Sequence, residues 1–541
     1  MLSHLKFKEN LLVFLFFVVF FTFGFLIYPD YGISIDEDNT RLGGFVSLKY
    51  IFQIFSPDFQ ASIDNIIITP HISDWKEWSI GPIFDIPTAF LEWLFNIKDS
   101  RNYYLLRHFV NFLFFFVSVY FFYLLIKKRY KSYIFALAGS ILLILSPRIF
   151  AHSFFNNKDI IFMSLYIIGI YVGINFVNKP SLKSSFFFSL VSALAIDIRI
   201  TGIILPVLFI FFYLINFLHV KNFKEIAVKP FLLFVFLTPL LIVLFWPYLW
   251  QSPFLNFIAA FQTLSNFDVN VFNFYMGNYI NAKNLPWHYL FVWIFITTPI
   301  FYVFLFFLGL FFSIKRIVNR VSKYDETESY NDLWRGKNEF FDLIILATFV
   351  APLIYILSFN STLYDGWRHL YFIYPSFLMI SIYALRLIKI KFFKIYQKTF
   401  IILFFLFLTP TIFWMIKNHP YQNIYFNKFV GKDFNKYFDM DYWGLSNVNA
   451  LKEIAIKEKE IVNVYAVGTT DLIISRSFLE KKYRSKINIT NNINEANYII
   501  NHYRNWLGNK INHKFKKPKN YEKFLEIKIN NVAINTIYKR N

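Results

Sequence analysis

Three consecutive acidic residues stand just beyond the first long apolar run of the chain. In the stretch GISIDEDNTR (residues 32–41), Asp36, Glu37 and Asp38 follow an apolar run at 10–28. An ionised carboxylate can take a proton from a hydroxyl group and so act as a general base. Acids in this position can equally be the solvated start of a loop. This stretch alone does not distinguish between the two roles.

Further charged and histidine residues stand at the ends of other apolar runs. They occur in three stretches, SPRIFAHSFFNNKD, AIDIRITG and YDGWRH, which carry Arg148, His152, Lys158, Asp159, Asp197, Arg199, Asp365, Arg368 and His369. A charge near the bilayer costs a few kcal/mol when it is neither paired nor in contact with water. Several such sites on one side of the membrane therefore predict a shared polar cavity.

Each of these residues also has a purely structural explanation. A carboxylate in the first turn of a helix, such as Asp159, gains about 0.3–1 kcal/mol from the helix dipole. Arg199 can extend its charged end to the membrane interface. Arg368 and His369 can form an ordinary helix start. His152 fits a packed interior better than a metal site, because no His-Glu-x-x-His spacing surrounds it. The prediction of a site therefore rests on the whole group of residues and not on any one of them.

The composition indicates an integral membrane protein. Of the 541 residues, 56% are hydrophobic and only 16% are charged, which is too apolar for a soluble domain. Cysteine is absent, which excludes disulfides and thiolate metal sites. Crossing the hydrocarbon core takes about 20 apolar residues, and about eleven runs approach that length. The predicted spans are 10–28, 104–126, 132–146, 159–178, 184–198, 200–218, 230–249, 289–314, 341–359, 369–388 and 399–416.

The positions of Lys and Arg predict how these spans are oriented, because positive charge is retained on the cytoplasmic side. With the N-terminus inside, every inner loop is basic: KKRYK (127–131), NKPSLK (178–183), HVKNFKEIAVK (219–229), 315–340 and KIKFFKIYQK (389–398). We therefore expect a multi-pass protein of the plasma (inner) membrane with a cytoplasmic N-terminus. The charged residues named above then all face the outer, periplasmic or extracellular, side.

These basic loops and a Lys-rich tail account for the net charge of +21, so nucleic-acid binding is not predicted. The tail, residues 417–541, has its own pattern. KEIVNVYAVG and ANYIINHYR predict strands, DLIISRSFLEKKYR predicts a helix, and FLEIKINNVAINTIYKR predicts two strands around a turn at Asn530–Asn531. The fold class is thus mainly α: a polytopic bundle (1–416) with a long first outer loop (29–103) and a small outer α/β domain.

The order of these features resembles the GT-C class of polytopic glycosyltransferases. The shared features are a first span, an outer Asp-Glu pair, a long first outer loop and an Asp at the outer start of the fourth span. Four segments, LPWHYLFVWIFITTP (285–299), YDGWRHLYFIYP (364–375), HPYQNIYFNKFVG (419–431) and DYWGLS (441–446), are similar to a bacterial branch of that superfamily. The superfamily includes the protein O-mannosyltransferases and aminoarabinose transferases of glycosyltransferase family 39. The resemblance covers nearly the whole chain.

The resemblance implies transfer of a sugar from a polyprenyl-phosphate donor to an acceptor hydroxyl, with inversion at the anomeric carbon. In the class, the first Asp of the outer pair is the catalytic base, which corresponds to Asp36. Glu37 would be its neighbour or substitute, and a second catalytic acid corresponds to Asp159. The large luminal insertion of the eukaryotic O-mannosyltransferases is missing. This absence argues against a protein Ser/Thr acceptor, and the candidate acceptors are a lipid, a glycan or a protein.

A departing phosphate needs cations to stabilise its charge. The candidates are Arg148, Lys158, Arg199 and Arg368, with Arg favoured for bidentate contact with phosphate. The candidate substrate-binding residues are His152, His369 and Asp365. The sequence fixes no cofactor, and it leaves open a divalent ion that would join the acids to the donor phosphate.

Two other classes of function remain as alternatives. A transporter or flippase for a lipid-linked or polar solute would also keep charges in a bundle. It predicts polar or broken segments near mid-membrane in paired positions, whereas the charges here gather at one face. A scaffold for envelope assembly would place the function in the α/β domain and use the spans as an anchor. In that case Asp36→Ala would have no effect.

Overall fold

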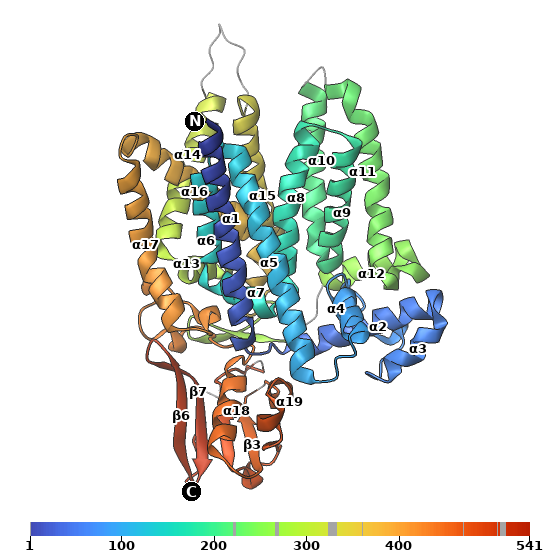
Figure 1. Cartoon of the computed structure of the whole chain (residues 1–541), viewed down its shortest axis with the longest axis vertical. Helices are drawn as coiled ribbons and strands as arrows, with labels where there is room; N and C mark the ends of the chain where they lie inside the picture. The colour runs from blue at the N-terminus through green and yellow to red at the C-terminus, as the bar shows by residue number, and fades with distance from the viewer. Residues whose placement is uncertain are drawn as a thin grey trace.

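A computed structural model of the chain describes residues 2–219, 223–265, 270–322, 333–359, 361–468, 470–505, 507–508 and 515–541. Long helices form a bundle, and a small α/β unit lies at one end of it (Figure 1). The N-terminus lies at the opposite end of the bundle, and the chain ends inside the α/β unit.

Nine helices in these described ranges are long and apolar enough to cross a membrane. They are α1 (Leu2–Ile27), α5 (Ser100–Tyr130), α8 (Asp159–Asn178), α10 (Ile204–His219), α11 (Phe223–Phe245), α14 (Ile300–Ser322), α15 (Gly336–Ser358), α16 (Tyr374–Phe392) and α17 (Gln397–Lys417). A tenth candidate is the pair α6 (Tyr133–Ile144) and α7 (Pro147–Phe155), bent by 69° between them. The predicted mainly α, polytopic fold is confirmed, with nine or ten candidate spans where about eleven were expected.

Two predicted spans differ from the helices observed. The span predicted at 289–314 is broken into α13 (Tyr289–Thr297) and α14, because Pro299 offers no backbone N–H to continue the first helix. The span predicted at 184–198 is α9 (Leu182–Ile198). With 17 residues it falls short of the usual length, and it packs against α8 and α11.

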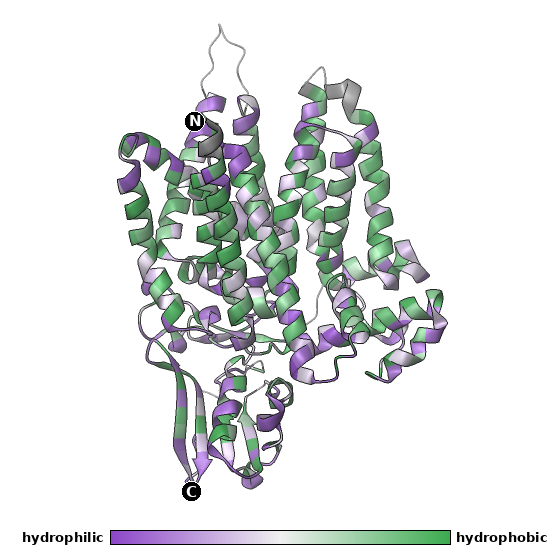
Figure 2. Cartoon of the chain, in the orientation of Figure 1, coloured by the Kyte–Doolittle hydropathy of each residue, from purple (hydrophilic) through white to green (hydrophobic). Residues whose placement is uncertain are grey.

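Hydrophilic residues gather at the two ends of the bundle (Figure 2). The end that holds the N-terminus carries the basic stretches at 127–131 and 389–398, between α5 and α6 and between α16 and α17. Of the predicted basic loops, residues 220–222 and 323–332 lie outside the described residues. The opposite end carries the charged residues ahead of α8 and α16, and the α/β unit.

The long segment between α1 and α5 is largely helical. α2 (Asp36–Phe55) begins at the acidic stretch and packs against α3 (Pro57–Asp64) and α4 (Asp85–Leu94). The Arg41 Nε donates to the Glu92 carboxylate at 3.0 and 3.1 Å, which joins α2 to α4 by a buried ion pair. This ion pair fixes the position of α2, whose first residue is Asp36.

Two further connections at the same end contain short elements. η3 (Ile200–Ile203) joins α9 to α10, and η4 (Pro247–Gln251), α12 (Pro253–Ser265) and an antiparallel hairpin of β1 (Phe272–Tyr275) and β2 (Asn278–Asn281) follow α11. Residues 266–269 of the predicted outer loop at 250–288 lie outside the described residues.

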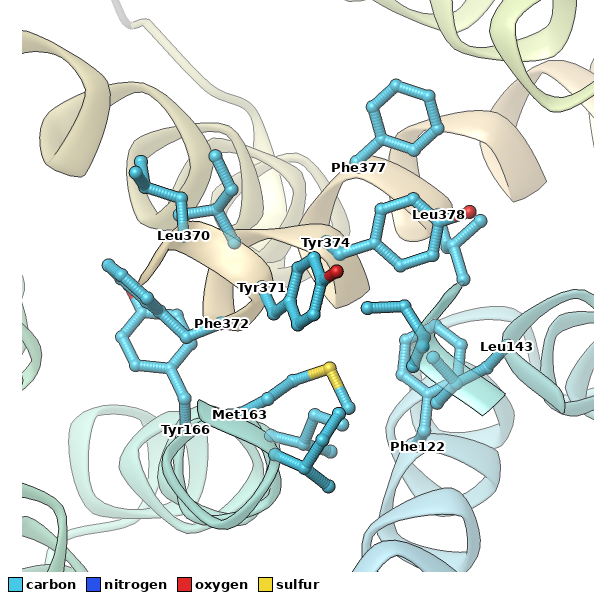
Figure 3. Close-up of a cluster of buried hydrophobic side chains, with 14 of the residues drawn as sticks. Phe122, Leu143, Met163, Tyr166, Leu370, Tyr371, Phe372, Tyr374, Phe377 and Leu378 are labelled. Atoms are coloured by element: carbon cyan, nitrogen blue, oxygen red, sulfur yellow. The ribbon is translucent and has the colours of Figure 1, made fainter. Parts of the chain in front are cut away.

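Aromatic and aliphatic side chains fill the core of the bundle. Figure 3 shows Tyr371 and Phe372, from η5 (Arg368–Ile373) just before α16, facing Met163 and Tyr166 of α8. The ring centroids of Phe372 and Tyr166 are 4.9 Å apart. This packing fixes the start of α16 beside α8, so the charged residues that precede the two helices come close together.

The α/β unit contains a five-stranded sheet in the order β4-β3-β5-β7-β6. The strands are β3 (Val462–Val467), β4 (Ile487–Ile489), β5 (Tyr498–Asn501), β6 (Tyr521–Ile529) and β7 (Val532–Arg540). β3 is parallel to β4 and β5, and β7 is antiparallel to β5 and β6. The predicted turn is confirmed: Asn530 and Asn531 have φ values of 50° and 69°, a conformation that Asn tolerates in tight hairpins.

Two details of the unit differ from the prediction. The helix predicted over 471–484 is divided into α19 (Leu472–Ser477) and α20 (Lys481–Arg484), and the additional helix α18 (Ser446–Lys457) precedes the sheet. The preceding segment, 418–445, contains η6 (Gln422–Ile424), η7 (Lys428–Val430) and η8 (Phe434–Lys436). Its residues Ile424, Phe434 and Trp443 are buried in the same core as the bundle helices, so it holds bundle and unit together.

Candidate active site

Arg368 lies at the centre of a cluster of carboxylates at the α/β end of the bundle. Its Nη1 is 3.1 Å from Asp159 Oδ2, and its Nη2 is 3.5 Å from Asp365 Oδ2 and 3.9 Å from Asp36 Oδ2. The Arg368 side chain is only 4% exposed. The structure thus brings together four of the residues predicted from three separate stretches of sequence.

Asp159 is buried and fully engaged. Besides Arg368, the Arg199 Nη2 donates to its Oδ1, and the Asn156 Nδ2 donates to its Oδ2 at 2.9 Å. The Asp159 backbone N–H donates to Asn156 Oδ1 at 2.9 Å, which closes the first turn of α8. The Asp159 side chain is 1% exposed. Both oxygens of this carboxylate therefore accept hydrogen bonds, from two guanidinium groups and an amide.

Asp36 is in a different environment, although it contacts the same arginine. Its side chain is 40% exposed, and its contact with Arg368 is at 3.9 Å, beyond hydrogen-bond length. It is the first residue of α2, so its carboxylate lies at the positive end of a helix dipole. Asp36 is an accessible carboxylate beside a cation.

The neighbouring acids point to other partners. The Glu37 carboxylate is buried, 3.0 Å from His108 Nε2, and its Oε1 accepts the Ser34 backbone N–H at 2.8 Å. Asp38 accepts a hydrogen bond from the Tyr104 hydroxyl at 2.8 Å. Successive residues of a helix point about 100° apart, so α2 separates the three acids. Of these three, Asp36 is the one that contacts Arg368.

Lys158 extends the charged cluster toward the segment between α1 and α5. Its Nζ is 3.3 Å from Glu77 Oε2. Burial acts to lower the pKa of Lys158, but the nearby carboxylates of Glu77, Asp36 and Asp85 outweigh it and raise the pKa. Lys158 is therefore a stable cation close to Asp36.

Arg148 differs from the other cations in its partners. Its side chain is buried, its Nε donates to the Tyr425 carbonyl at 3.1 Å, and its guanidinium lies 4.8 Å from the centroid of Phe426 and 5.2 Å from that of Trp293. Within the part of the chain that the structure describes, no carboxylate lies within 4.0 Å of it. The buried Nη2 also lacks a hydrogen-bond acceptor there. Arg148 is thus suited to hold an anion.

The two candidate histidines lie beside this cluster. His152 is fully buried, with Nε2 3.0 Å from the Tyr442 hydroxyl and Nδ1 2.9 Å from Asn156 Nδ2. It therefore supports Asn156, which in turn bonds Asp159. His369 is half-buried, and its ring packs edge-on against Tyr364 at 4.6 Å between centroids.

Two residues of the cluster were not among the sequence candidates. Arg504, after β5 in the α/β unit, donates from Nη2 to Asp365 Oδ1 at 2.8 Å and from Nη1 to Asp439 Oδ2 at 2.5 Å. All three side chains are buried. The available signal was an arginine directly after a buried strand, in ANYIINHYR, because residues at the carboxyl ends of parallel strands often reach functional sites.

An apolar groove of about 1440 Å³ lies on one side of the cluster, between α14, α16 and α17. Its walls include Phe304, Phe404 and Phe407. At the end near the α/β unit, the lining includes Lys417, Lys428 and Lys432, together with the turn at Asn530–Asn531. Tyr425 and Phe426 line the groove and also contact Arg148, so one wall of the groove borders the candidate site.

A smaller polar cavity lies on the α2 side. It is lined by Thr40, Glu77, Asp85 and Lys158 and by the rings of Trp75, Trp78, Trp246 and Tyr248. Thr40 is one helical turn after Asp36 and therefore lies on the same face of α2. The cavity thus reaches Lys158 and the face of α2 that carries Asp36, and the groove reaches the residues beside Arg148.

No group of three or more His, Asp or Glu residues in the described ranges is arranged to hold a metal ion. The three carboxylates of Asp36, Asp159 and Asp365 surround the guanidinium of Arg368 instead. The divalent ion that the sequence leaves open is not tested by this geometry.

Comparison with known proteins supports the resemblance found in the sequence. Residues 99–246 match the family model described as dolichyl-phosphate-mannose-protein mannosyltransferase. This confirms the predicted resemblance to membrane glycosyltransferases of the GT-C class over α5 to α11, which hold Arg148, His152, Lys158, Asp159 and Arg199. No curated protein matches the chain by sequence.

Several solved structures are similar at low identity. ArnT from Cupriavidus metallidurans in the apo state has 10% sequence identity and a TM-score of 0.47, over 82% of this chain and 68% of that chain. ArnT from the same organism bound to undecaprenyl phosphate has 10% identity and a TM-score of 0.46, over 97% of each chain. The Archaeoglobus fulgidus oligosaccharyltransferase in complex with Zn and sulfate has 10% identity and a TM-score of 0.40, over 86% of this chain and 59% of that chain.

Proposed function

We propose that this protein is a membrane glycosyltransferase that transfers a sugar from a polyprenyl-phosphate donor to an acceptor hydroxyl at the α/β end of the bundle. One observation carries the proposal: an accessible carboxylate, Asp36, lies 3.9 Å from the buried Arg368, in a cluster that a polar cavity borders at Lys158 and an apolar groove borders beside Arg148. The family match over α5 to α11 supports the same class of reaction.

Asp36 is proposed as the general base, because it is the exposed acid of the cluster. Asp159 is a poorer base, since its two oxygens are held by Arg199, Arg368 and Asn156. We assign Asp159 to the positioning of the two arginines. Glu37 is assigned a structural role at the start of α2, because its carboxylate is bonded to His108 and Ser34.

The reaction then proceeds in one displacement. The acceptor O–H gives its proton to Asp36, the acceptor oxygen forms a bond to the anomeric carbon, and the bond from that carbon to the phosphate oxygen breaks. The electron pair leaves with the polyprenyl phosphate, whose charge grows as it departs. Attack from the face opposite the phosphate inverts the anomeric centre.

The arginines are suited to receive that charge. Arg148, which has no carboxylate within 4.0 Å among the described residues, is the proposed main contact of the phosphate, with Arg368 next to it and Arg199 and Lys158 beyond. Preorganised cations in a buried site stabilise developing charge more strongly than they would in water. Arginine also matches phosphate oxygens in a bidentate manner.

The groove is the proposed site of the polyprenyl chain. Its apolar walls suit an isoprenoid, and Lys417, Lys428 and Lys432 at the end near the α/β unit suit the phosphate at its head. The shared wall of Tyr425 and Phe426 would bring that phosphate next to Arg148. The polar cavity near Asp36 is the proposed approach of the acceptor. By the distribution of Lys and Arg, this end of the molecule faces the periplasm or cell exterior.

The test is transfer by the purified protein from a panel of radiolabelled polyprenyl-phosphate sugars, with a membrane extract as the source of acceptors. We expect transfer by the wild type and a loss of about 10²–10⁴-fold in Asp36→Asn, the contribution typical of a general base. Donor binding and thermal unfolding should not change, because Asp36 is exposed and weakly paired.

Asp38→Asn is the matched control, because Asp38 lies two residues away and bonds Tyr104 instead of Arg368. It should transfer at nearly the wild-type rate. Equal activity of Asp36→Asn and the wild type would exclude Asp36 as the base, and retention of the anomeric configuration by NMR would exclude single displacement. Donor binding without transfer, together with movement of the lipid between leaflets, would favour the flippase. A chelator added to the same assay tests the divalent ion.

A further inference from the structure

The turn that precedes Arg368 is held in place by tertiary contacts. Asp365 and Gly366 have φ values of 58° and 73°, both in the left-handed region. For a residue other than glycine this conformation costs on the order of 1 kcal/mol or more, so surrounding contacts must maintain it. The Asp365 backbone N–H donates to Asn273 Oδ1 at 3.0 Å, and its carboxylate accepts a hydrogen bond from Arg504.

Arg504 supplies that second contact from the α/β unit. Its side chain is 1% exposed and lies between two acids, with Nη2 2.8 Å from Asp365 Oδ1 and Nη1 2.5 Å from Asp439 Oδ2. Asp439 is itself fixed, since its Oδ2 also accepts the Phe274 backbone N–H at 2.8 Å. The guanidinium therefore connects β5 of the unit with the hairpin strand β1 and with the turn ahead of α16.

Asp365 passes this constraint on to Arg368. Its Oδ1 faces Arg504 and its Oδ2 lies 3.5 Å from Arg368 Nη2, so one carboxylate stands between two guanidinium groups. Arg368 is also placed between the rings of Tyr364 and Trp443, at 4.8 and 4.9 Å from their centroids. A shift of Asp365 would therefore turn Arg368 relative to Asp36 and Asp159.

We propose that Arg504 is a positioning residue for the transfer reaction: it holds Asp365, and through it the Arg368 guanidinium, against the carboxylates of Asp36 and Asp159. The inference rests on the proposed glycosyltransferase function. By this proposal, the α/β unit helps to position residues of the site through Arg504. Arg504 makes the shorter of the two contacts of Asp365, at 2.8 Å against 3.5 Å for Arg368, so its loss would leave this buried carboxylate poorly paired, which is costly.

A change in pH dependence would separate positioning from simple docking of the unit. The charged groups that face Asp365 are Arg504, Arg368, Asp439 and Asp36. Burial raises the pKa of Asp365 to about 6, and Arg504 is the strongest of the groups that oppose this rise. Loss of Arg504 should therefore raise the pKa further, so that Asp365 is protonated, and Arg368 released, at a higher pH.

The experiment compares Arg504→Gln, Arg504→Lys and a control, Arg484→Gln, in the purified full-length chain. Arg484 also joins the unit to the bundle, with Nη2 2.7 Å from Asp99 Oδ2, but its partner is outside the Arg368 cluster. The readouts are transfer between pH 5 and 8, the affinity for polyprenyl phosphate without a sugar, and thermal unfolding in detergent.

We expect Arg504→Gln to lower transfer about 10²-fold, the loss typical of a misplacement of about 1 Å in a catalytic group. The acidic limb of its pH profile should move upward, and its affinity for polyprenyl phosphate should fall. Arg504→Lys should recover part of the loss and fold normally, and Arg484→Gln should resemble the wild type in transfer. Equal transfer by Arg504→Gln and the wild type, or equal losses in Arg504→Gln and Arg484→Gln, would overturn the proposal. A wild type that neither binds polyprenyl phosphate nor transfers sugar would instead reject the proposed function, and the inference with it.

Discussion

The two ends of the bundle contain the same arrangement of charged residues, one aspartate between two arginines, in two different environments. At the α/β end, Asp159 lies between Arg199 and Arg368. α15 starts at the end of the bundle that holds the N-terminus (Figure 1), and near its start Asp342 lies between Arg129 and Arg316. Both aspartates are mostly shielded from solvent, with side chains 1% and 12% exposed.

The difference lies in what else the arginines contact. Arg129 grips Asp342 with two bonds, from Nε at 2.6 Å and from Nη2 at 2.7 Å, and Arg316 adds a third at 2.8 Å. Among the described residues, no other carboxylate lies within 4.0 Å of these two arginines. Arg368, in contrast, also faces Asp36 and Asp365, and Asp36 is open to solvent. The same ion-pair unit is thus structural at one end and part of a candidate active site at the other.

The largest expected effect comes from neutralising each aspartate. Asp159→Asn leaves Arg199 and Arg368 buried without their shared carboxylate, a change that typically costs about 3–5 kcal/mol of stability. Transfer should also fall severely, because Arg368 loses its closest anchor. Asp342→Asn should lower stability less, because its group is more exposed, and should leave transfer near the wild-type rate. Thermal unfolding in detergent and the transfer assay measure the two effects.

This pair of variants separates structure from function within one comparison. If Asp342→Asn abolished transfer as completely as Asp159→Asn does, the two clusters would not differ in role. If Asp159→Asn kept full transfer, Arg368 would not need this partner. A wild-type-like melting temperature for both variants would show that neither ion pair supports the bundle.

A pH experiment sharpens the contrast at the α/β end. Burial raises the pKa of Asp365 from an ordinary 3.8 to about 6, against the attraction of Arg504 and Arg368. Between about pH 6 and 4 the folded chain therefore binds a proton that the unfolded chain does not, so the contribution of Asp365 to stability grows as the pH falls. For a shift of about two units this amounts to roughly 3 kcal/mol. The rate of transfer should instead decrease as the pH falls, because a protonated Asp365 holds Arg368 less firmly.

The measurement compares melting temperatures of the wild type and Asp365→Asn over pH 4.5–7.5, with transfer assayed in parallel. Asp85, whose pKa burial also raises to about 6, is present in both proteins, so its contribution cancels in the difference. Parallel curves for the two proteins would show that Asp365 does not titrate in this range.

Much of the architecture follows from local sequence. Runs such as 104–126 and 399–416 become long helices because burial of apolar side chains and internal backbone pairing are determined locally. The gathering of charged stretches at one end also follows, since each stands at the boundary of an apolar run. These boundaries are what bring Asp36, Asp159 and Arg368 to one site.

The rest depends on contacts that a linear pattern does not carry. The span predicted at 289–314 ran through the break before α14 because the apolar runs on both sides of Thr297, Thr298 and Pro299 are separated by these three residues alone. Glu37 and Asp36 are neighbours in sequence, but successive residues of a helix point in different directions. Glu37 therefore contacts His108, whereas Asp36 is exposed. Arg504 reaches the site because of how the α/β unit docks; its position after β5 marks the end of a strand but does not specify that docking.

The smallest expected effect concerns an ion pair on the outer surface of the α/β unit. Lys539 Nζ lies 2.7 Å from Glu458 Oε1, as short as the contacts in the two buried clusters, but the Lys539 side chain is 49% exposed. Such pairs typically contribute about 0.2–1 kcal/mol, and Glu458 retains a second partner in the Tyr498 hydroxyl at 2.5 Å. Lys539→Gln should therefore change the melting temperature slightly at low salt and not at 1 M salt, where the charges are screened. Transfer should be unaffected. A loss of stability as large as that of Asp342→Asn would mean that distance, and not burial, decides what these ion pairs contribute.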